Sequence, residues 1–236
     1  MERSRKPCPF GLLGSNPSVG VFHFNKIFLK MKERKIRLTK KERDIIKKLN
    51  TPRKIQDYIN NNIKYDFDND SIVRSFRMVL KDRRANCLDG AIFSASVLYF
   101  YGKKPLIVCM EARDMDHNIA VYKENGKWGS IAQSRDQNLK EREPRFNSIK
   151  DLVMSYYPYY WDCFSDPEDI TNLTLRGYSL VNLERFMPEF IVSEESLNHI
   201  EDFLWQTRYR FLFPRHDMKK FYRIDKKTEK LFFEEH

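Results

Sequence analysis

The chain has 236 residues, and its 43 Lys/Arg against 33 Asp/Glu give a formal net charge of +10. With 41% hydrophobic and 14% aromatic residues, the composition argues for a globular protein and against a disordered one. No apolar run approaches the roughly 20 residues that a membrane span needs. The four cysteines have no close pairing pattern and no metal-ligand spacing, so we expect a cytoplasmic protein without disulfides, metal or cofactor.

The positive charge is concentrated at the N-terminus. Residues 1–48 hold 14 Lys/Arg and four Asp/Glu, mainly within residues 26–48, whereas the remaining residues are neutral in sum. Such a segment either makes weak electrostatic contacts with nucleic acid or an anionic membrane, or is a basic arm with a solvated helix face. Frequent Pro and Gly residues before position 21 predict a poorly ordered start. We therefore expect an extension over residues 1–38 and a single domain over residues 39–236.

Two helices are predicted in the first half of the chain. Thr39-x-x-Glu42 is a capping box before an amphipathic stretch. The run that follows Cys87 has no helix breaker before Gly102, so Cys87 should lie near a helix N-terminus. Unpaired backbone N–H groups and the helix dipole favour a thiolate there. A Cys before an apolar helix can also be a small buried hydrophobic residue.

A β-hairpin follows. Asn125-Gly126 predicts a two-residue type I′ turn between strands at 117–124 and 127–134, with a further strand at 105–110. The turn pairs residues whose numbers sum to 251. His117 then faces Ser134, with Ala132 diagonal to it on the same face and Gln133 on the other face.

The rest of the chain continues the α+β pattern. We expect a helix at 149–157, a strand pair bent at Gly177 within 173–181, a helix at 193–212 and a terminal hairpin at 221–233. The aromatic cluster at 156–161 either lines a substrate cleft or belongs to the core.

Several of these motifs together resemble the core of the transglutaminase-like (papain-related) superfamily. They are Cys87-x-x-Gly90-Ala91, Gly102-Lys-Lys-Pro105-Leu-Ile-Val, Asp116-His117 and Gly126-Lys-Trp128, preceded by Thr51–Gln56 and Ile63–Tyr65. The resemblance covers about residues 51–135. It implies an α+β fold in which the helix that bears the Cys packs on an antiparallel sheet. It also implies a catalytic Cys at a helix N-terminus, a His at the start of a strand and an Asp on the next strand, which assigns Cys87 as nucleophile and His117 as base.

One position departs from the family pattern. The Asp of the family follows the Trp by four residues, and Ala132 stands there. Ser134 is the only polar side chain on the same face of the hairpin, so it is our candidate for the third catalytic residue. A serine stabilises an imidazolium less than a carboxylate does. A slow enzyme, an enzyme with another orienting group and a degenerate site all remain open.

The function expected from this pattern is cysteine-dependent acyl transfer on a protein or peptide substrate. Cys87 would attack a carboxamide or peptide carbonyl, His117 would act as base and then acid, and the Cys87 backbone N–H would stabilise the oxyanion. The acyl group would pass to water in a peptidase or amidase, or to an amine in a transamidase. The alternatives are a catalytically decayed binding module on the same scaffold and a basic nucleic-acid adaptor. The acyl acceptor and the oligomeric state are left open.

Overall fold

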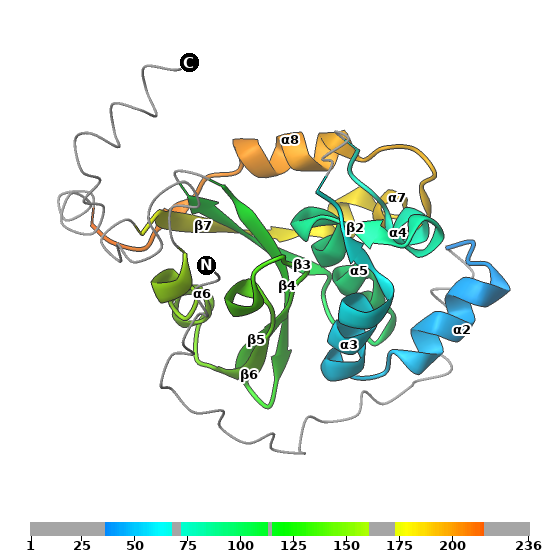
Figure 1. Cartoon of the computed structure of the whole chain (residues 1–236), viewed down its shortest axis with the longest axis horizontal. Helices are drawn as coiled ribbons and strands as arrows, with labels where there is room; N and C mark the ends of the chain where they lie inside the picture. The colour runs from blue at the N-terminus through cyan, green and yellow to red at the C-terminus, as the bar shows by residue number, and fades with distance from the viewer. Residues whose placement is uncertain (1–35, 68–71, 113–114, 161–172, 215–236) are drawn as a thin grey trace, which may run out of the picture.

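The computed structural model describes residues 36–67, 72–112, 115–160 and 173–214. It has an α+β fold in which the helices of the N-terminal half cover one face of an antiparallel sheet (Figure 1). This confirms the predicted α+β class.

Each of the described helices in the N-terminal half begins directly after a capping residue. The four helices are α2 (Lys40–Lys48), α3 (Pro52–Asn62), α4 (Phe76–Asp82) and α5 (Cys87–Phe100). The predicted capping box is present in α2, since Thr39 Oγ1 accepts from Glu42 N at 3.2 Å and Glu42 Oε2 accepts from Thr39 N at 2.6 Å. The predicted helix at Cys87 is also confirmed. It ends before Gly102, whose φ of 80° is of the left-handed kind that glycine tolerates best.

The main sheet has the strand order β6-β5-β4-β3-β7-β8, with every neighbouring pair antiparallel. Its strands are β3 (Leu106–Ala112), β4 (His117–Glu124), β5 (Lys127–Ile131), β6 (Arg142–Phe146), β7 (Leu175–Asn182) and β8 (Arg210–Phe211). Asn125 and Gly126 have φ of 49° and 78°, as a type I′ turn requires. Ala120 lies opposite Ile131, so the predicted hairpin register is confirmed.

Smaller elements complete the fold. A two-stranded parallel sheet joins β1 (Lys64–Tyr65) to β2 (Arg84–Ala85), and the remaining helices are α6 (Ile149–Met154), α7 (Glu189–Val192) and α8 (Asn198–Gln206). Single 3₁₀ turns span Gln137–Leu139, Tyr157–Tyr159 and Leu183–Phe186. Two expectations are corrected. The helix predicted at 193–212 is wrong in its extent, since only α8 within it is helical and β8 follows, and the predicted strand pair at 173–181 is the single strand β7. The hairpin predicted at 221–233 lies outside the described residues.

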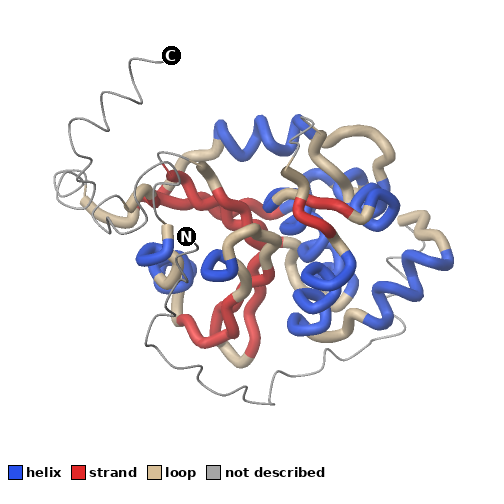
Figure 2. Tube along the Cα trace, in the orientation of Figure 1, coloured by secondary structure: helices blue, strands red, loops and turns tan. Residues whose placement is uncertain are grey.

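Helices lie on both sides of the sheet (Figure 2). Each face of the sheet packs in its own hydrophobic core. The helix-side core includes Phe76 and Phe93 from α4 and α5, together with Ala120 and Tyr122 of β4. The opposite core contains Ile119 and Val121 of the same strand and the side chains of α6. Odd-numbered residues of β4 therefore point away from α5, and even-numbered residues point toward it.

The packed region begins before the boundary that we predicted. Ile36 and Leu38 are buried in the helix-side core, so the domain starts at residue 36 or earlier rather than at 39. Among the described helices, none is long and apolar enough to cross a membrane.

Candidate functional site

Cys87 is the first residue of α5 and is partly exposed. Asn86 and Asp89 fix this helix start through a second capping box. Asn86 Oδ1 accepts from Asp89 N at 3.0 Å, and Asp89 Oδ2 accepts from Asn86 N at 3.3 Å. The thiol is thus held at the N-terminus of a well-capped helix, as predicted.

Asn118 lies next to the thiol, and His117 does not. The Asn118 Nδ2 group donates toward Cys87 Sγ over 3.9 Å. His117 shares the odd-numbered face of β4 with Ile119 and therefore points into the opposite core. The expected Cys87–His117 pair is not formed, because neighbouring residues of a strand point to opposite faces of the sheet.

His117 has a partner of its own on that far face. Its Nε2 lies 2.9 Å from the backbone oxygen of Leu139, so Nε2 carries the hydrogen and donates it. Burial lowers the pKa of His117 to about 4, against the Leu139 hydrogen bond, which raises it. The imidazole is therefore neutral at neutral pH and serves to tie β4 to the 3₁₀ turn at Gln137–Leu139.

Ser134 and Ala132 do not complete a triad. Ser134 lies beyond the end of β5, and its Oγ accepts from Asp136 N at 3.1 Å. Ala132 is fully buried in the opposite core, and Gln56 binds both its N and its O at 2.9 and 2.8 Å. The hydrogen bond from His117 Nε2 goes to the backbone oxygen of Leu139, and Ser134 as the orienting residue stays a prediction.

Gln133 lies on the other face of the hairpin from Ala132, as predicted, and this is the face that meets α5. A Cβ added at Gly90, on the first turns of α5, would overlap the Gln133 Cβ. The hairpin register, continued past β5, sets Gln133 opposite Asn118. Cys87 is thus accompanied by two neutral amide residues, which the sequence analysis missed. The alternation along β4 was the available signal, but both faces of that strand are buried and give no contrast.

The surroundings of Cys87 keep its thiol protonated. Burial raises the pKa of Cys87 above its ordinary value, and the negative charge of Asp89 raises it further. Hydrogen bonds from the backbone and side chain of Asn118 and from the Leu88 backbone act in the opposite direction but do not outweigh burial. The thiolate expected at this helix N-terminus is therefore not favoured, chiefly because burial disfavours the charged form, with the negative charge of Asp89 acting in the same direction.

A buried ion network lies beneath the site. The Arg74 guanidinium is 2% exposed and contacts Asp66 at 2.8 Å, Asp82 at 3.1 Å and Asp89 at 3.2 Å. Burial raises the pKa of Asp89 to about 6, with Arg74 opposing that shift. This network joins α4, α5 and the segment after β1. Its charges pair with one another inside the fold.

Cys109 is the other described cysteine, and it is a core residue. It lies opposite Asn118 in the β3–β4 pair, and its Sγ is 3.2 Å from the Tyr209 hydroxyl. Burial raises its pKa to about 12. Across the described ranges, no three His, Cys, Asp or Glu side chains are grouped so that they could hold a metal ion.

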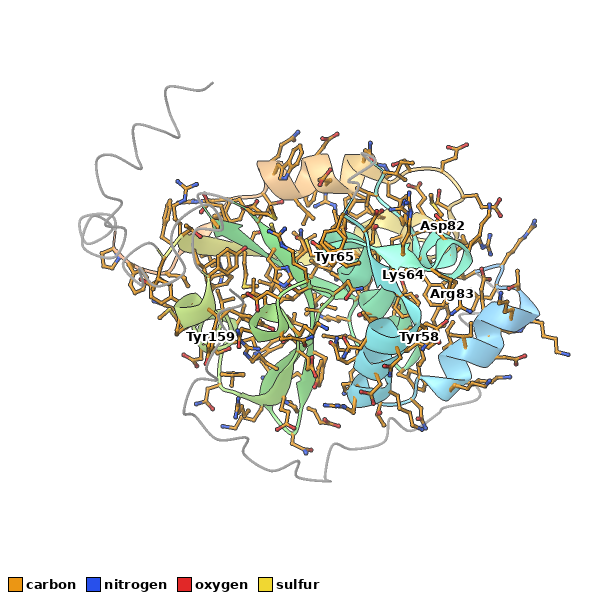
Figure 3. The ribbon with its side chains drawn as sticks, in the orientation of Figure 1. Tyr58, Lys64, Tyr65, Asp82, Arg83 and Tyr159 are labelled. Atoms are coloured by element: carbon orange, nitrogen blue, oxygen red, sulfur yellow. The ribbon has the colours of Figure 1, made fainter. Side chains whose placement is uncertain are left out.

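A polar groove of about 860 Å³ adjoins the Cys87 region. It is lined by the end of α3, by β1 and Phe67, by Asp82–Arg84, and by Gln133, Ser134 and Lys140. Lys64, Tyr65, Asp82 and Arg83 come together on this side of the molecule, and Tyr159 lies on the other side (Figure 3). Tyr65 is one of the residues that line the groove, and burial is the main cause that raises its pKa to about 12.

The aromatic cluster predicted as cleft or core belongs mainly to the core. Tyr156 and Tyr160 are buried on the face of the sheet away from Cys87, and Tyr159 is 42% exposed there. Trp161 lies outside the described residues. These rings do not line the groove beside Cys87.

Comparison with models of known protein families gives no match for this sequence. Comparison with curated proteins gives none either.

Proposed function

We propose that the chain is a binding module on a transglutaminase-like arrangement of helix and sheet, in which Cys87 does not act as a nucleophile. The observation that carries the proposal is the 3.9 Å contact of Cys87 with the amide of Asn118. A thiol needs a neighbouring base or a lowered pKa to attack a carbonyl. An amide cannot take up its proton, and burial raises its pKa.

The experiment looks for the covalent intermediate. The protein is incubated with glutamine-containing peptides, quenched in acid and mapped by mass spectrometry for a thioester on Cys87, with Cys87→Ala as the control. The proposal expects no adduct on Cys87. An adduct that appears in the parent and is absent from Cys87→Ala would overturn it.

A second candidate is cysteine-dependent acyl transfer that does not use His117. Its supporting observation is the position of Cys87 as the partly exposed first residue of α5, with Asn118 and Leu88 N–H groups directed at the sulfur. Such donors stabilise a thiolate once it forms. The same thioester experiment separates the two candidates, because only the enzyme accumulates an acyl group on Cys87.

A further inference from the structure

The first part of the chain that the structure describes is rich in basic residues, and we call it the basic half. Residues 36–84 hold 14 Lys/Arg against seven Asp/Glu. On α2 and α3, the exposed cations are Lys40, Lys41, Lys47, Lys48, Arg53 and Lys54. These helices lie on the same side of the sheet as α4 and β2 (Figure 1). A positive field spread over several elements suits a long polyanion better than a single anionic group.

The groove lies at the edge of this basic half. Its rim includes Lys64, Arg83, Arg84 and Lys140. The two acidic residues of the lining form ion pairs with the buried Arg74, which contacts Asp66 at 2.8 Å and Asp82 at 3.1 Å. The described part of the groove therefore presents more positive than negative charge to a ligand.

An aromatic platform stands among these cations. The Phe67 side chain is 68% exposed, and its ring meets Tyr65 edge-on at 5.0 Å between centroids. Contact with a partner would remove the large apolar area of the Phe67 ring from water. The exposed ring is therefore a candidate contact site. The side chains of Asn60, Asn61 and Asn62 add exposed amide donors and acceptors at the same groove.

We infer that this groove binds single-stranded nucleic acid. Bases stack on Phe67, and Lys64, Arg83 and Lys140 contact phosphates. The inference rests on the proposed function as a binding module and names its ligand class. An acidic peptide would satisfy the cations, but it would not use an exposed ring beside them, so nucleic acid fits both observations.

The test measures binding of fluorescein-labelled oligo(dT) and oligo(U) by fluorescence anisotropy between 50 and 200 mM salt. Phe67→Ala should weaken binding about 5- to 100-fold, as loss of one stacked base does. Lys64→Glu with Arg83→Glu should weaken binding and reduce its salt dependence. The matched control, Arg145→Glu with Lys150→Glu near α6, changes net charge equally and should leave affinity within about twofold.

Three results would overturn the inference: no binding at 50 mM salt, binding that Phe67→Ala leaves unchanged, or displacement of the oligonucleotide by polyglutamate at equal charge. A failed inference is distinguishable from a failed proposed function. The inference fails if the oligonucleotide does not bind, or if its binding does not depend on Phe67. The proposed function fails if a thioester forms on Cys87.

Discussion

Two adjacent residues of β4 have opposite surroundings, and this decides the chemistry of the site. Asn118 meets the thiol of Cys87, while His117 is bound to Leu139 beyond the other face of the sheet. A shift of one position along a strand moves a side chain through the sheet, so the base and the thiol are separated by the sheet itself. Among the described residues, an amide rather than an imidazole therefore contacts the thiol.

His117 should affect stability in a defined pH range. Its pKa is near 6.5 when unfolded and about 4 when folded, so between these values the unfolded chain binds more protons. The free energy of unfolding should thus fall as pH drops from about 6.5 to 4, by at most about 3 kcal/mol. Asp89, with its pKa raised to about 6, acts in the opposite direction over part of this range.

Urea unfolding of the parent and of His117→Asn at pH 7, 5.5 and 4.5 isolates the histidine, because Asp89 contributes to both proteins. The stability difference between them should shrink as the pH falls. A difference that stays constant with pH would show that His117 titrates normally in the folded chain.

Substitution of Arg74 should lower the free energy of unfolding more than most substitutions do. Arg74→Met leaves the buried carboxylate of Asp89 without its cation and Asp66 with Arg84 alone at 3.6 Å, for which we expect a loss of about 3–5 kcal/mol in urea unfolding. The control is Arg53→Met, which breaks an exposed pair with Asp57 at 2.9 Å and should cost less than about 0.5 kcal/mol. Equal losses in the two variants would contradict a stabilising role for the network.

At the residue scale, the sequence predicted the position of Cys87 and not its neighbours. Helix signals are local, so the unbroken run up to Gly102 was enough to place Cys87 near the start of α5, whereas the capping box of Asn86 and Asp89 was found only in the structure. The face on which His117 lies depends on which side of the sheet α5 packs. That is a tertiary property, and a strand buried on both faces does not disclose it.

At the scale of elements, α5 and the hairpin after β4 meet at a close contact between Gly90 and Gln133. Gly90→Ala should cost about 1–3 kcal/mol in thermal or urea unfolding, because the new Cβ overlaps the Gln133 Cβ. Combining it with Gln133→Gly, which removes that atom, should recover much of the loss.

The comparison is Gly126→Ala, which meets nothing within 4 Å but sits at a φ of +78°. It should cost about 1 kcal/mol through backbone strain alone, without rescue by Gln133→Gly. If Gln133→Gly rescues neither or both glycine variants, the contact between α5 and the hairpin is not as described.

Elements set by short-range signals were predicted well, and those set by packing were not. The Asn125-Gly126 turn determined the register of β4 and β5. By contrast, residues 193–212 have helical spacing, but only Asn198–Gln206 form a helix, α8. Ser193 ends α7, and its Oγ accepts from Glu195 N at 3.0 Å in the connecting turn. Side chain–backbone bonds of this kind compete with helix continuation.

At the scale of the whole molecule, the sheet separates two environments. Its helix-side face carries Cys87, Asn118 and Gln133 and leads to the basic groove, and its other face holds His117 and the rings of Tyr156 and Tyr160. The sequence showed the concentration of positive charge but not the groove, because the groove is lined by segments far apart in the chain that meet only after folding.

The most direct test of the account is the pH dependence of Cys87 alkylation by iodoacetamide, followed by peptide mass spectrometry so that the cysteines are resolved. The parent should react with a midpoint above that of an ordinary cysteine, His117→Asn should not change it, and Asn118→Ala should raise it further through loss of a donor. A midpoint below about pH 7 that His117→Asn abolishes would contradict the account, because it would show an imidazole paired with the thiol.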